Sequence, residues 1–335
     1  MALSAPLVSI IIPTYNYAHY LSDAVDSVLN SGFSASELEI IVIDDGSTDD
    51  SALKIEAYRD RVKYITQENS GKAWATKVGI EHSRGDYVFN LDADDLFLPG
   101  KIQEVVDIFE KEAEVVHVAH PAIHWNSISN QRTTESFPSL MRGRKIQGPD
   151  LLAYFYRQGI LYGGGSTFAA RAKILKSIPI PRDVDMLIDE YLVIMTLQHG
   201  CSFFIDHPLS IWRIHGQNFS AGTGDFGRIQ SKLQRRLRAL NRTGAIISAS
   251  GIHAELKKLY VLKNKAAILG IKEELGQKSI SDILNLWRYI CNNFSVFRWG
   301  ELGTLRHYKV LNRTLPTIAV KVLRALLGKE PFTVS

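Results

Sequence analysis

Short hydrophobic runs alternate with amphipathic segments over the first hundred residues of the chain. Between residues 21 and 29 apolar side chains recur at helical spacing, and Ser31 and Gly32 mark the end of that segment. Such alternation is typical of a parallel sheet covered by crossover helices, because strands buried on both faces are continuously apolar. The expected strands are Val8–Ile12, Leu38–Ile43, Val62–Thr66 and Tyr87–Leu91.

The pattern then adds elements and changes character. A short helix is expected after Asp50 to about Arg59, another over Gly71–Ser83, and a fourth opening at Pro99. Residues 125–165 have weak periodicity, which predicts loops with short elements, and the pattern is helical beyond about residue 226. Further expected elements are strands at Val115–Val118, Thr167–Ala170, Cys201–Ile205 and Leu209–Ile214, and a helix at Asp189–His199.

We therefore predict an α/β fold with a mostly parallel open sheet flanked by helices over residues 1–222. A helical C-terminal region follows over residues 223–335, after a linker-like stretch near residues 220–226.

Composition limits the class of protein. Of 335 residues, 45% are hydrophobic and 22% charged, which excludes a disordered chain and a multi-span membrane protein. Cys201 and Cys291 cannot form a disulfide framework, and no Cys/His cluster has zinc-ligand spacing. The pattern contains neither an export signal nor a membrane span, so we expect a cytoplasmic protein.

Polar residues follow each expected strand at the edge where an open parallel sheet binds ligands. Pro13, Thr14, Tyr15 and Asn16 come after the first strand, and Asp44 and Asp45 after the second. Asp92, Asp94 and Asp95 come after the fourth, so five aspartates and an aromatic ring gather at one edge. Acids at strand ends can also cap the next helix, which is the better interpretation for Asp49 and Asp50.

The usual nucleotide-binding fingerprints are absent from the sequence. No Gly-x-Gly-x-x-Gly follows the first strand, and there is no Gly-Lys-Ser/Thr phosphate loop. An acidic edge would repel an anionic ligand unless a divalent metal intervenes, and carboxylate oxygens suit Mg²⁺ or Mn²⁺. The residues therefore indicate a metal-bridged diphosphate, and nothing in them indicates a nucleic-acid partner.

Three ordered motifs carry a family resemblance. They are Val8-Ser-Ile-Ile-Ile-Pro-Thr-Tyr-Asn16, Ile41-Val-Ile-Asp-Asp-Gly-Ser-Thr-Asp49 and Leu91-Asp-Ala-Asp-Asp-Leu-Phe-Leu-Pro99. Together they resemble the family 2 glycosyltransferases, inverting enzymes with a GT-A fold. The resemblance implies that Tyr15 and Asp45 contact the nucleotide base, Asp92 the ribose and Asp94 the metal. Asp95 is a second candidate metal ligand, and Pro13 and Ala93 complete the expected donor-binding set.

The resemblance also implies a catalytic base at the start of a helix, where the family has a Glu-Asp pair. Asp189 falls on that Asp, with Ile188 in place of the Glu, and Glu190 is the alternative base if the register slips by one. An Asp in a first helical turn also stabilises the helix dipole. Lys77 stands where similar proteins often have Asn, and it either reaches a phosphate or lies on a solvated face.

Two later segments belong to the same expected site. Trp212-Arg213-Ile214-His215-Gly216 resembles the family's aromatic-Arg-x-His-Gly segment, in which His215 is either a ligand of metal or diphosphate or a structural residue. Gly163, Gly164 and Gly165 would allow close backbone approach to a sugar, although a flexible turn explains them equally well.

The motifs together predict a metal-dependent inverting glycosyltransferase with a nucleotide-diphospho-sugar donor, and we expect a UDP-sugar. The expected acceptor is a glycan or lipid-linked hydroxyl in cell-envelope or exported polysaccharide synthesis. Two alternatives stay open, a sugar-nucleotide nucleotidyltransferase and a non-catalytic protein that binds the same donor.

The C-terminal segment is basic. No acidic residue occurs from Leu302 to Gly328, whereas five cations punctuate a partly apolar stretch. Such a segment suits a peripheral helix at an anionic membrane surface, and a helix packed on protein or in a dimer contact suits it equally. The five cations are Arg306, Lys309, Arg313, Lys321 and Arg324.

Overall fold

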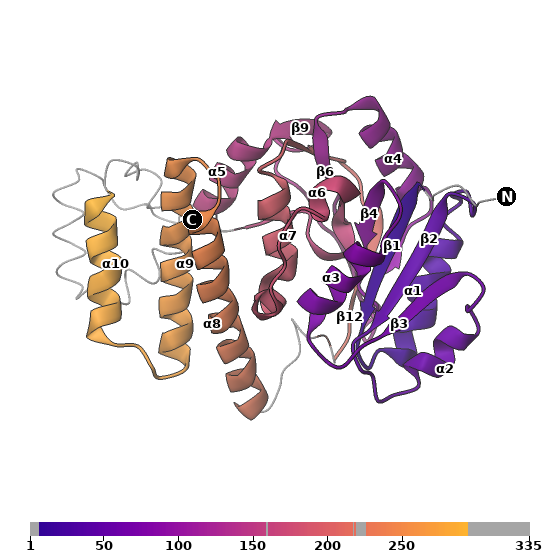
Figure 1. The fold of residues 1–335 in the computed structure, drawn as a ribbon, viewed down its shortest axis with the longest axis horizontal. Helices are drawn as coiled ribbons and strands as arrows, with labels where there is room; N and C mark the ends of the chain where they lie inside the picture. The colour runs from indigo at the N-terminus through magenta and orange to yellow at the C-terminus, as the bar shows by residue number, and fades with distance from the viewer. Residues whose placement is uncertain (1–6, 159, 217, 219–225, 294–335) are drawn as a thin grey trace. The chain divides into compact units, whose positions relative to one another are not determined.

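The computed structural model describes residues 7–158, 160–216, 218 and 226–293 (Figure 1). These residues divide into two compact units. The first lies within residues 1–151 and 161–229, and the second within residues 152–160 and 230–335. The first unit contains the sheets, and the second consists of helical segments.

An eight-stranded mixed sheet forms the centre of the first unit, with strand order β3-β2-β1-β4-β10-β6-β11-β9. Strands β1 to β4 are parallel to one another, whereas β10 is inserted antiparallel between β4 and β6. The strands are β1 (Val8–Thr14), β2 (Leu38–Asp44), β3 (Val62–Thr66), β4 (Tyr87–Asn90), β6 (Val115–Ala119), β9 (Arg144–Gln147), β10 (Phe168–Arg171) and β11 (Cys201–Phe204).

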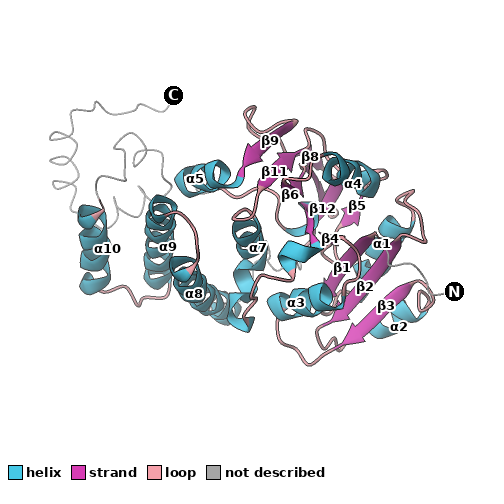
Figure 2. Cartoon of the chain, turned by 45° about the horizontal axis from the view of Figure 1, so that its top comes forward, coloured by secondary structure: helices cyan, strands magenta, loops and turns pink. Residues whose placement is uncertain are grey.

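A second, four-stranded sheet has the order β5-β12-β7-β8. Its strands are β5 (Leu96–Phe97), β7 (Ala122–Asn126), β8 (Arg132–Thr134) and β12 (Ser210–Ile214). The predicted α/β class with a helix-flanked sheet is confirmed, and so is the helical character of the described C-terminal region (Figure 2). The weakly periodic middle segment holds β8, β9 and helix α5 (Gly148–Gln158), which the sequence pattern did not separate.

Helices cover both faces of the parallel strands. Ile10 and Ile12 of β1 belong to the core that α1 and α4 share, while Ile11 points to the opposite face. There α3 packs so closely that a Cβ on Gly79 would lie 2.3 Å from the Ile11 side chain. The alternation follows from the two-residue period of a strand. These helices are α1 (Ala18–Leu29), α2 (Ser51–Glu56), α3 (Lys72–His82) and α4 (Lys101–Lys111).

Four helices differ at their ends from the expected bounds. Helix α3 covers Lys72–His82 rather than Gly71–Ser83. Helix α2 stops at Glu56 rather than near Arg59, and α4 begins at Lys101 rather than at Pro99. Gly100 precedes α4 with φ +82°, a conformation that glycine adopts without strain, so the turn continues past the proline. Helix α7 covers Ile188–Thr196, so it begins one residue earlier and ends three residues earlier than the predicted Asp189–His199.

The direction of β10 determines which loop reaches the ligand-binding edge. Because β10 is antiparallel to β4, its beginning lies beside the carboxyl end of that strand. The preceding turn, η1 (Gly165–Thr167), is therefore brought next to the segment after β4. A glycine-rich loop distant in sequence thus joins the aspartates at this edge.

The second unit contains α9 (Ala254–Glu274), α10 (Ile280–Asn292) and most of α8 (Phe226–Ala249). Buried polar groups join α8 and α9, since the Tyr260 hydroxyl donates to Thr243 Oγ1 at 2.9 Å and Asn264 donates to the Leu240 carbonyl at 2.8 Å. No helix in the described part of the chain is long and apolar enough to cross a membrane. The basic segment from Leu302 to Gly328 lies outside the described residues.

Candidate active site

The loop after β2 organises the first part of the site. Asp45 is buried, and its Oδ1 accepts hydrogen bonds from Gln67 Nε2 and the Ser70 amide, both at 2.7 Å. Its Oδ2 accepts from the Gly71 amide at 2.8 Å. Asp45 therefore fixes the segment that leads into α3. This structural role is additional to the base contact that the family resemblance implies.

Tyr15 lies at the end of β1 with 45% of its surface exposed, the arrangement that a ring offered to a nucleotide base requires. Pro13 is buried inside β1. The backbone after Tyr15 is held in a positive-φ conformation at Asn16 (φ +57°), whose side chain accepts from the Thr48 amide at 2.8 Å. The Tyr15 ring is thus held on a loop that is hydrogen-bonded to the loop after β2.

Asp92 and Asp189 meet around one cation. Lys72 Nζ lies 2.9 Å from Asp92 Oδ1 and 3.0 Å from Asp189 Oδ2. Lys72 opens α3, Asp92 follows β4, and Asp189 lies in the first turn of α7. The fold therefore brings together two predicted site residues that are distant in sequence, Asp92 and Asp189, through a lysine that the sequence pattern did not single out.

Asp189 is held by backbone as well as by Lys72. The Gly165 amide donates to its carboxylate, and a Cβ on Gly164 would lie 3.1 Å from the Asp189 Cβ. Burial raises the pKa of the Asp189 carboxyl above its ordinary value, an effect that the nearby Asp92 charge reinforces and the Lys72 ammonium opposes. A carboxylate with a raised pKa is a better proton acceptor than an ordinary surface aspartate.

Asp94 faces a different neighbour. Its Oδ2 lies 3.2 Å from His215 Nε2 and accepts from Asn218 Nδ2 at 3.1 Å. The His215 ring is buried, with Tyr20 at a centroid distance of 4.4 Å and Tyr17 at 5.9 Å. Burial, and then the charge of Asp92, raise the pKa of the Asp94 carboxyl.

These residues fit a divalent metal in their donor chemistry. Asp94 and His215 offer a carboxylate oxygen and an imidazole nitrogen at one point, and a cation there would offset the charge of Asp92 and Asp94. Among the described residues, no group of three or more His, Cys, Asp or Glu side chains converges on a common point. Asp94 and His215 would therefore supply part of the coordination shell of a metal, and oxygens of a diphosphate would supply the remaining ligands.

Asp95 has its oxygens turned into the protein. Its Oδ1 accepts from the Arg213 amide at 3.0 Å, and its Oδ2 accepts from Ser166 Oγ at 2.5 Å. Burial raises the pKa of this carboxyl well above its ordinary value, and the charges of Asp94 and Asp92 add to the effect. These contacts favour a structural role for Asp95 over that of a metal ligand.

Lys101 ties the glycine-rich loop to the core. Its fully buried Nζ donates to the Ser166 carbonyl at 2.6 Å and to Ser210 Oγ at 3.0 Å, and it lies 3.4 Å from the centre of the Phe97 ring. Ser166 in turn accepts from the Asp92 amide at 3.0 Å. Burial lowers the pKa of the Lys101 amine well below its ordinary value. The network holds the Asp92 segment against the loop that contacts Asp189.

The remaining predicted site residues lie as follows. Lys77 contacts Glu81 at 3.1 Å and the Trp74 ring at 4.0 Å, both on its own helix, which favours the solvated-face alternative. Ala93 is buried between Asp92 and Asp94. Glu190 is half-buried beside Asp189 in the first turn of α7.

Sequence reasoning missed Lys72, Lys101, Ser166 and Asn218. Lys72 and Lys101 are ordinary lysines at helix starts. The one available signal was the excess of carboxylates over cations at this sheet edge, which favours a lysine nearby. Asn218 stood three residues after His215, close to a segment already assigned to the site.

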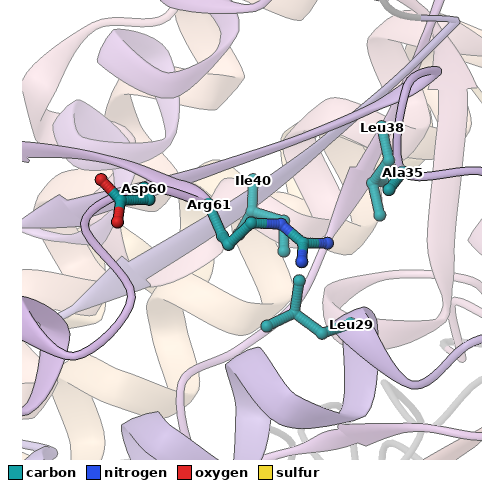
Figure 3. A pocket seen from close by; sticks show the side chains of 6 residues that line it. All are labelled: Leu29, Ala35, Leu38, Ile40, Asp60 and Arg61. Atoms are coloured by element: carbon teal, nitrogen blue, oxygen red, sulfur yellow. The ribbon is translucent and has the colours of Figure 1, made fainter.

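A separate hollow of about 140 Å³ lies away from these residues (Figure 3). It is lined by Leu38 and Ile40 from the start of β2 and by Leu29 from the end of α1. Asp44 and Asp45 lie at the opposite end of β2, so this hollow is not part of the candidate site.

Comparisons with known proteins identify the family of the chain. Residues 9–178 match the model of glycosyl transferase family 2. An uncharacterized glycosyltransferase of Nostoc sp. is 34% identical over 220 residues, which are 63% of this chain and 66% of that protein. The matched part of the chain thus spans just under two thirds of that relative, and about a third of the matching glycosyltransferases of Rickettsia typhi and Rickettsia prowazekii.

Two solved structures share the fold. S. aureus TarS 1-349 in complex with UDP-GlcNAc has a TM-score of 0.63 at 13% identity, over 96% of this chain and 92% of that one. The mannosyltransferase PcManGT from Pyrobaculum calidifontis, in complex with GDP-Man and Mn²⁺, has a TM-score of 0.52 at 16% identity, over 97% and 88%. The family match and the shared fold show that the chain belongs to glycosyl transferase family 2 and has the GT-A fold.

Proposed function

We propose that this protein is a metal-dependent, inverting glycosyltransferase of the hexosyltransferase type, with a UDP-sugar as donor. The observation that carries the proposal is the meeting of three aspartates in different environments at one sheet edge. Asp94 pairs with His215, whereas Asp92 and Asp189 share Lys72. The family match favours glycosyl transfer over the nucleotidyl-transfer alternative.

Each residue has a distinct task in this proposal. Tyr15 stacks on the base and Asp92 binds the ribose, with Asp45 behind the same loop. Asp94 and His215 would hold Mn²⁺ or Mg²⁺, which when bound screens the diphosphate and stabilises the leaving group. The UDP-GlcNAc in one related structure supports a UDP-sugar donor, and the Mn²⁺ beside GDP-Man in the other supports a divalent metal with a nucleotide-sugar.

Asp189 acts as the general base. Its carboxylate accepts the proton of the acceptor hydroxyl while that oxygen forms a bond to the anomeric carbon. The bond from the anomeric carbon to the β-phosphate oxygen breaks, and UDP leaves with the electron pair. The contact between Lys72 and Asp189 supports Asp189 over Glu190, because it fixes one carboxylate oxygen beside Asp92.

The acceptor in this proposal is a hydroxyl of a glycan or lipid-linked glycan in cell-envelope or exported polysaccharide synthesis, and the reaction is cytoplasmic. The basic segment from Leu302 to Gly328 would bring the enzyme to the inner face of an anionic membrane. Sedimentation of the full chain with anionic vesicles, but not with neutral ones, at low salt tests this part.

The donor and metal assignment is tested by thermal unfolding with a panel of UDP-sugars, each with and without Mn²⁺. A donor at 100 times its dissociation constant stabilises the folded state by about 2.7 kcal/mol. Asp94→Ala should lose the Mn²⁺-dependent part of that stabilisation. Asp107→Ala, an exposed acid on α4, is the control and should keep it. Full Mn²⁺-dependent stabilisation of Asp94→Ala would exclude Asp94 as a ligand.

The base assignment is tested by UDP release from the UDP-sugar that stabilises the protein most, with water as the acceptor. Asp189→Asn should bind that donor as tightly as the unaltered protein and turn over about 10²-fold more slowly, in line with general-base contributions. Near-normal turnover of Asp189→Asn, with the loss in Glu190→Gln instead, would move the base by one residue.

A further inference from the structure

Lys72 occupies a position that local structure fixes from several sides. It is the first residue of α3, and the preceding amides of Ser70 and Gly71 donate to Asp45 at 2.7 and 2.8 Å. Asp185 lies over Gly71, where a Cβ would be 2.5 Å from the carboxylate, and it accepts from the Ala73 amide at 3.4 Å. The backbone of Lys72 is therefore anchored, and its ammonium reaches a defined point.

At that point the Lys72 ammonium forms ion pairs with two carboxylates, those of Asp92 and Asp189. Asp92 Oδ2 and Asp189 Oδ2 would lie 3.6 and 3.9 Å from a Cβ on Gly165, so both carboxylates face the same glycine even apart from their lysine contacts. Two carboxylates held this close raise one another's pKa unless a cation lies between them. Lys72 provides that cation, at 2.9 Å from Asp92 and 3.0 Å from Asp189.

We propose that Lys72 is a positioning residue for the catalytic base: its ammonium keeps the Asp189 carboxylate ionised and orients it beside Asp92. The inference rests on the proposed role of Asp189. A base must be ionised before it can accept the proton of the acceptor hydroxyl, and ionisation of a partly buried aspartate beside a second aspartate is disfavoured unless a cation offsets the two charges.

The groups around Asp189 define the expected pH effect. Lys72 faces it from α3, Asp92 from the segment after β4, and the Gly165 amide from the glycine-rich loop. Asp185 lies over the start of α3 rather than on the Asp189 oxygens. Lys72 is thus the cation that lowers the pKa of Asp189, against the burial and the Asp92 charge that raise it.

The test is the pH dependence of kcat/KM for UDP release from the preferred UDP-sugar, measured with the full chain and Mn²⁺. In Lys72→Met the acid limb should move to higher pH by about one to three units, the range by which a nearby opposite charge alters a carboxyl pKa. Lys72→Arg should restore the limb to within a fraction of a unit, because it returns the positive charge.

Lys77→Met serves as the matched control, since Lys77 lies on the same helix and pairs with Glu81. Its acid limb should coincide with that of the unaltered protein. Thermal unfolding of each variant shows whether it is folded. If Lys72→Met does not fold, Lys72→Arg keeps the test decisive. A uniform loss of rate at every pH in Lys72→Met, with the limb unmoved, would overturn the positioning role.

Failure of the underlying assignment gives a different result. If Asp189→Asn keeps its turnover, Asp189 is not the base, and both the proposed function of that residue and this inference fall. If Asp189→Asn loses turnover while the limb of Lys72→Met stays in place, only the role of Lys72 falls.

Discussion

His117 shows how one buried side chain supports the site and makes stability depend on pH. Its Nε2 lies 2.9 Å from the Gly163 carbonyl and its Nδ1 lies 2.8 Å from Ser202 Oγ, so both ring nitrogens are engaged inside the core. Burial lowers the pKa of His117 to about 4. When the pH falls below the ordinary pKa of histidine, the unfolded chain binds a proton at His117 that the folded state does not bind.

The sign of the effect follows from this difference. Above about pH 6.5 His117 is neutral in both states and contributes no pH dependence. Between about pH 6.5 and 4 the unfolded state binds more protons, so the free energy of unfolding falls as pH falls, by about 3 kcal/mol at most. Urea unfolding at a series of pH values should show a smaller fall for His117→Asn than for the unaltered protein. The exposed His19→Asn is the control, and an equal fall in His117→Asn would contradict the assignment.

Residues also show how far sequence reasoning reaches. Asp92, Asp94 and Asp189 were found because motifs after strands and at helix starts carry them, and the structure brings Asp92 and Asp189 to one point. Lys72 could not be found in this way, because its partners are 20 and 117 residues distant in sequence. Their meeting depends on where β4 ends and α7 begins in space, and local sequence does not contain that information.

At the scale of elements, the loop before β10 depends on its glycines. Gly163 has φ +82°, and a Cβ there would lie 2.5 Å from Ala119 Cβ and 2.7 Å from the His117 ring. The expected strand Thr167–Ala170 is close to the observed β10, but its pattern does not reveal that the strand runs antiparallel. That direction places Gly165 beside Asp189, so this part of the site lay beyond prediction from periodicity alone.

Gly163→Ala and Gly143→Ala separate backbone strain from crowding. Both glycines have positive φ, but a Cβ on Gly143 (φ +61°) meets nothing within 4 Å. Gly143→Ala should cost about 1 kcal/mol of unfolding free energy, the typical strain of a left-handed residue. Gly163→Ala should cost about 1–3 kcal/mol more because its Cβ overlaps the core, and it should also slow UDP release. Equal urea midpoints for the two variants would show that the core near Ala119 yields to the extra methyl group.

For the whole molecule, the boundary between the two units is not a single cut in the chain. Residues 152–160 belong to the second unit, although they lie about 70 residues before the helices that make up its remainder. Phe155 and Tyr156 in this segment are each 1% exposed, and the Tyr156 ring lies 5.4 Å from the Tyr260 ring. The sequence pattern indicated a change near residue 222, but a short amphipathic helix inside a loop-like region does not show which core it joins.

A chain that ends at Ile229 should therefore be less stable and prone to association. Removal of α9 takes away Tyr260 and uncovers Tyr156, and each large aromatic side chain that loses its burial costs about 2 kcal/mol or more. Size-exclusion chromatography and binding of a hydrophobic dye should show soluble aggregates with exposed apolar surface. A chain that ends at Asn293 keeps α8, α9 and α10 and serves as the control, with elution expected in proportion to its mass. Tyr156→Ser in the shorter chain should reduce the association, because it removes the ring that α9 covered. A monodisperse shorter chain that unfolds at the same temperature as the full chain would show that residues 152–160 are stable without the C-terminal helices.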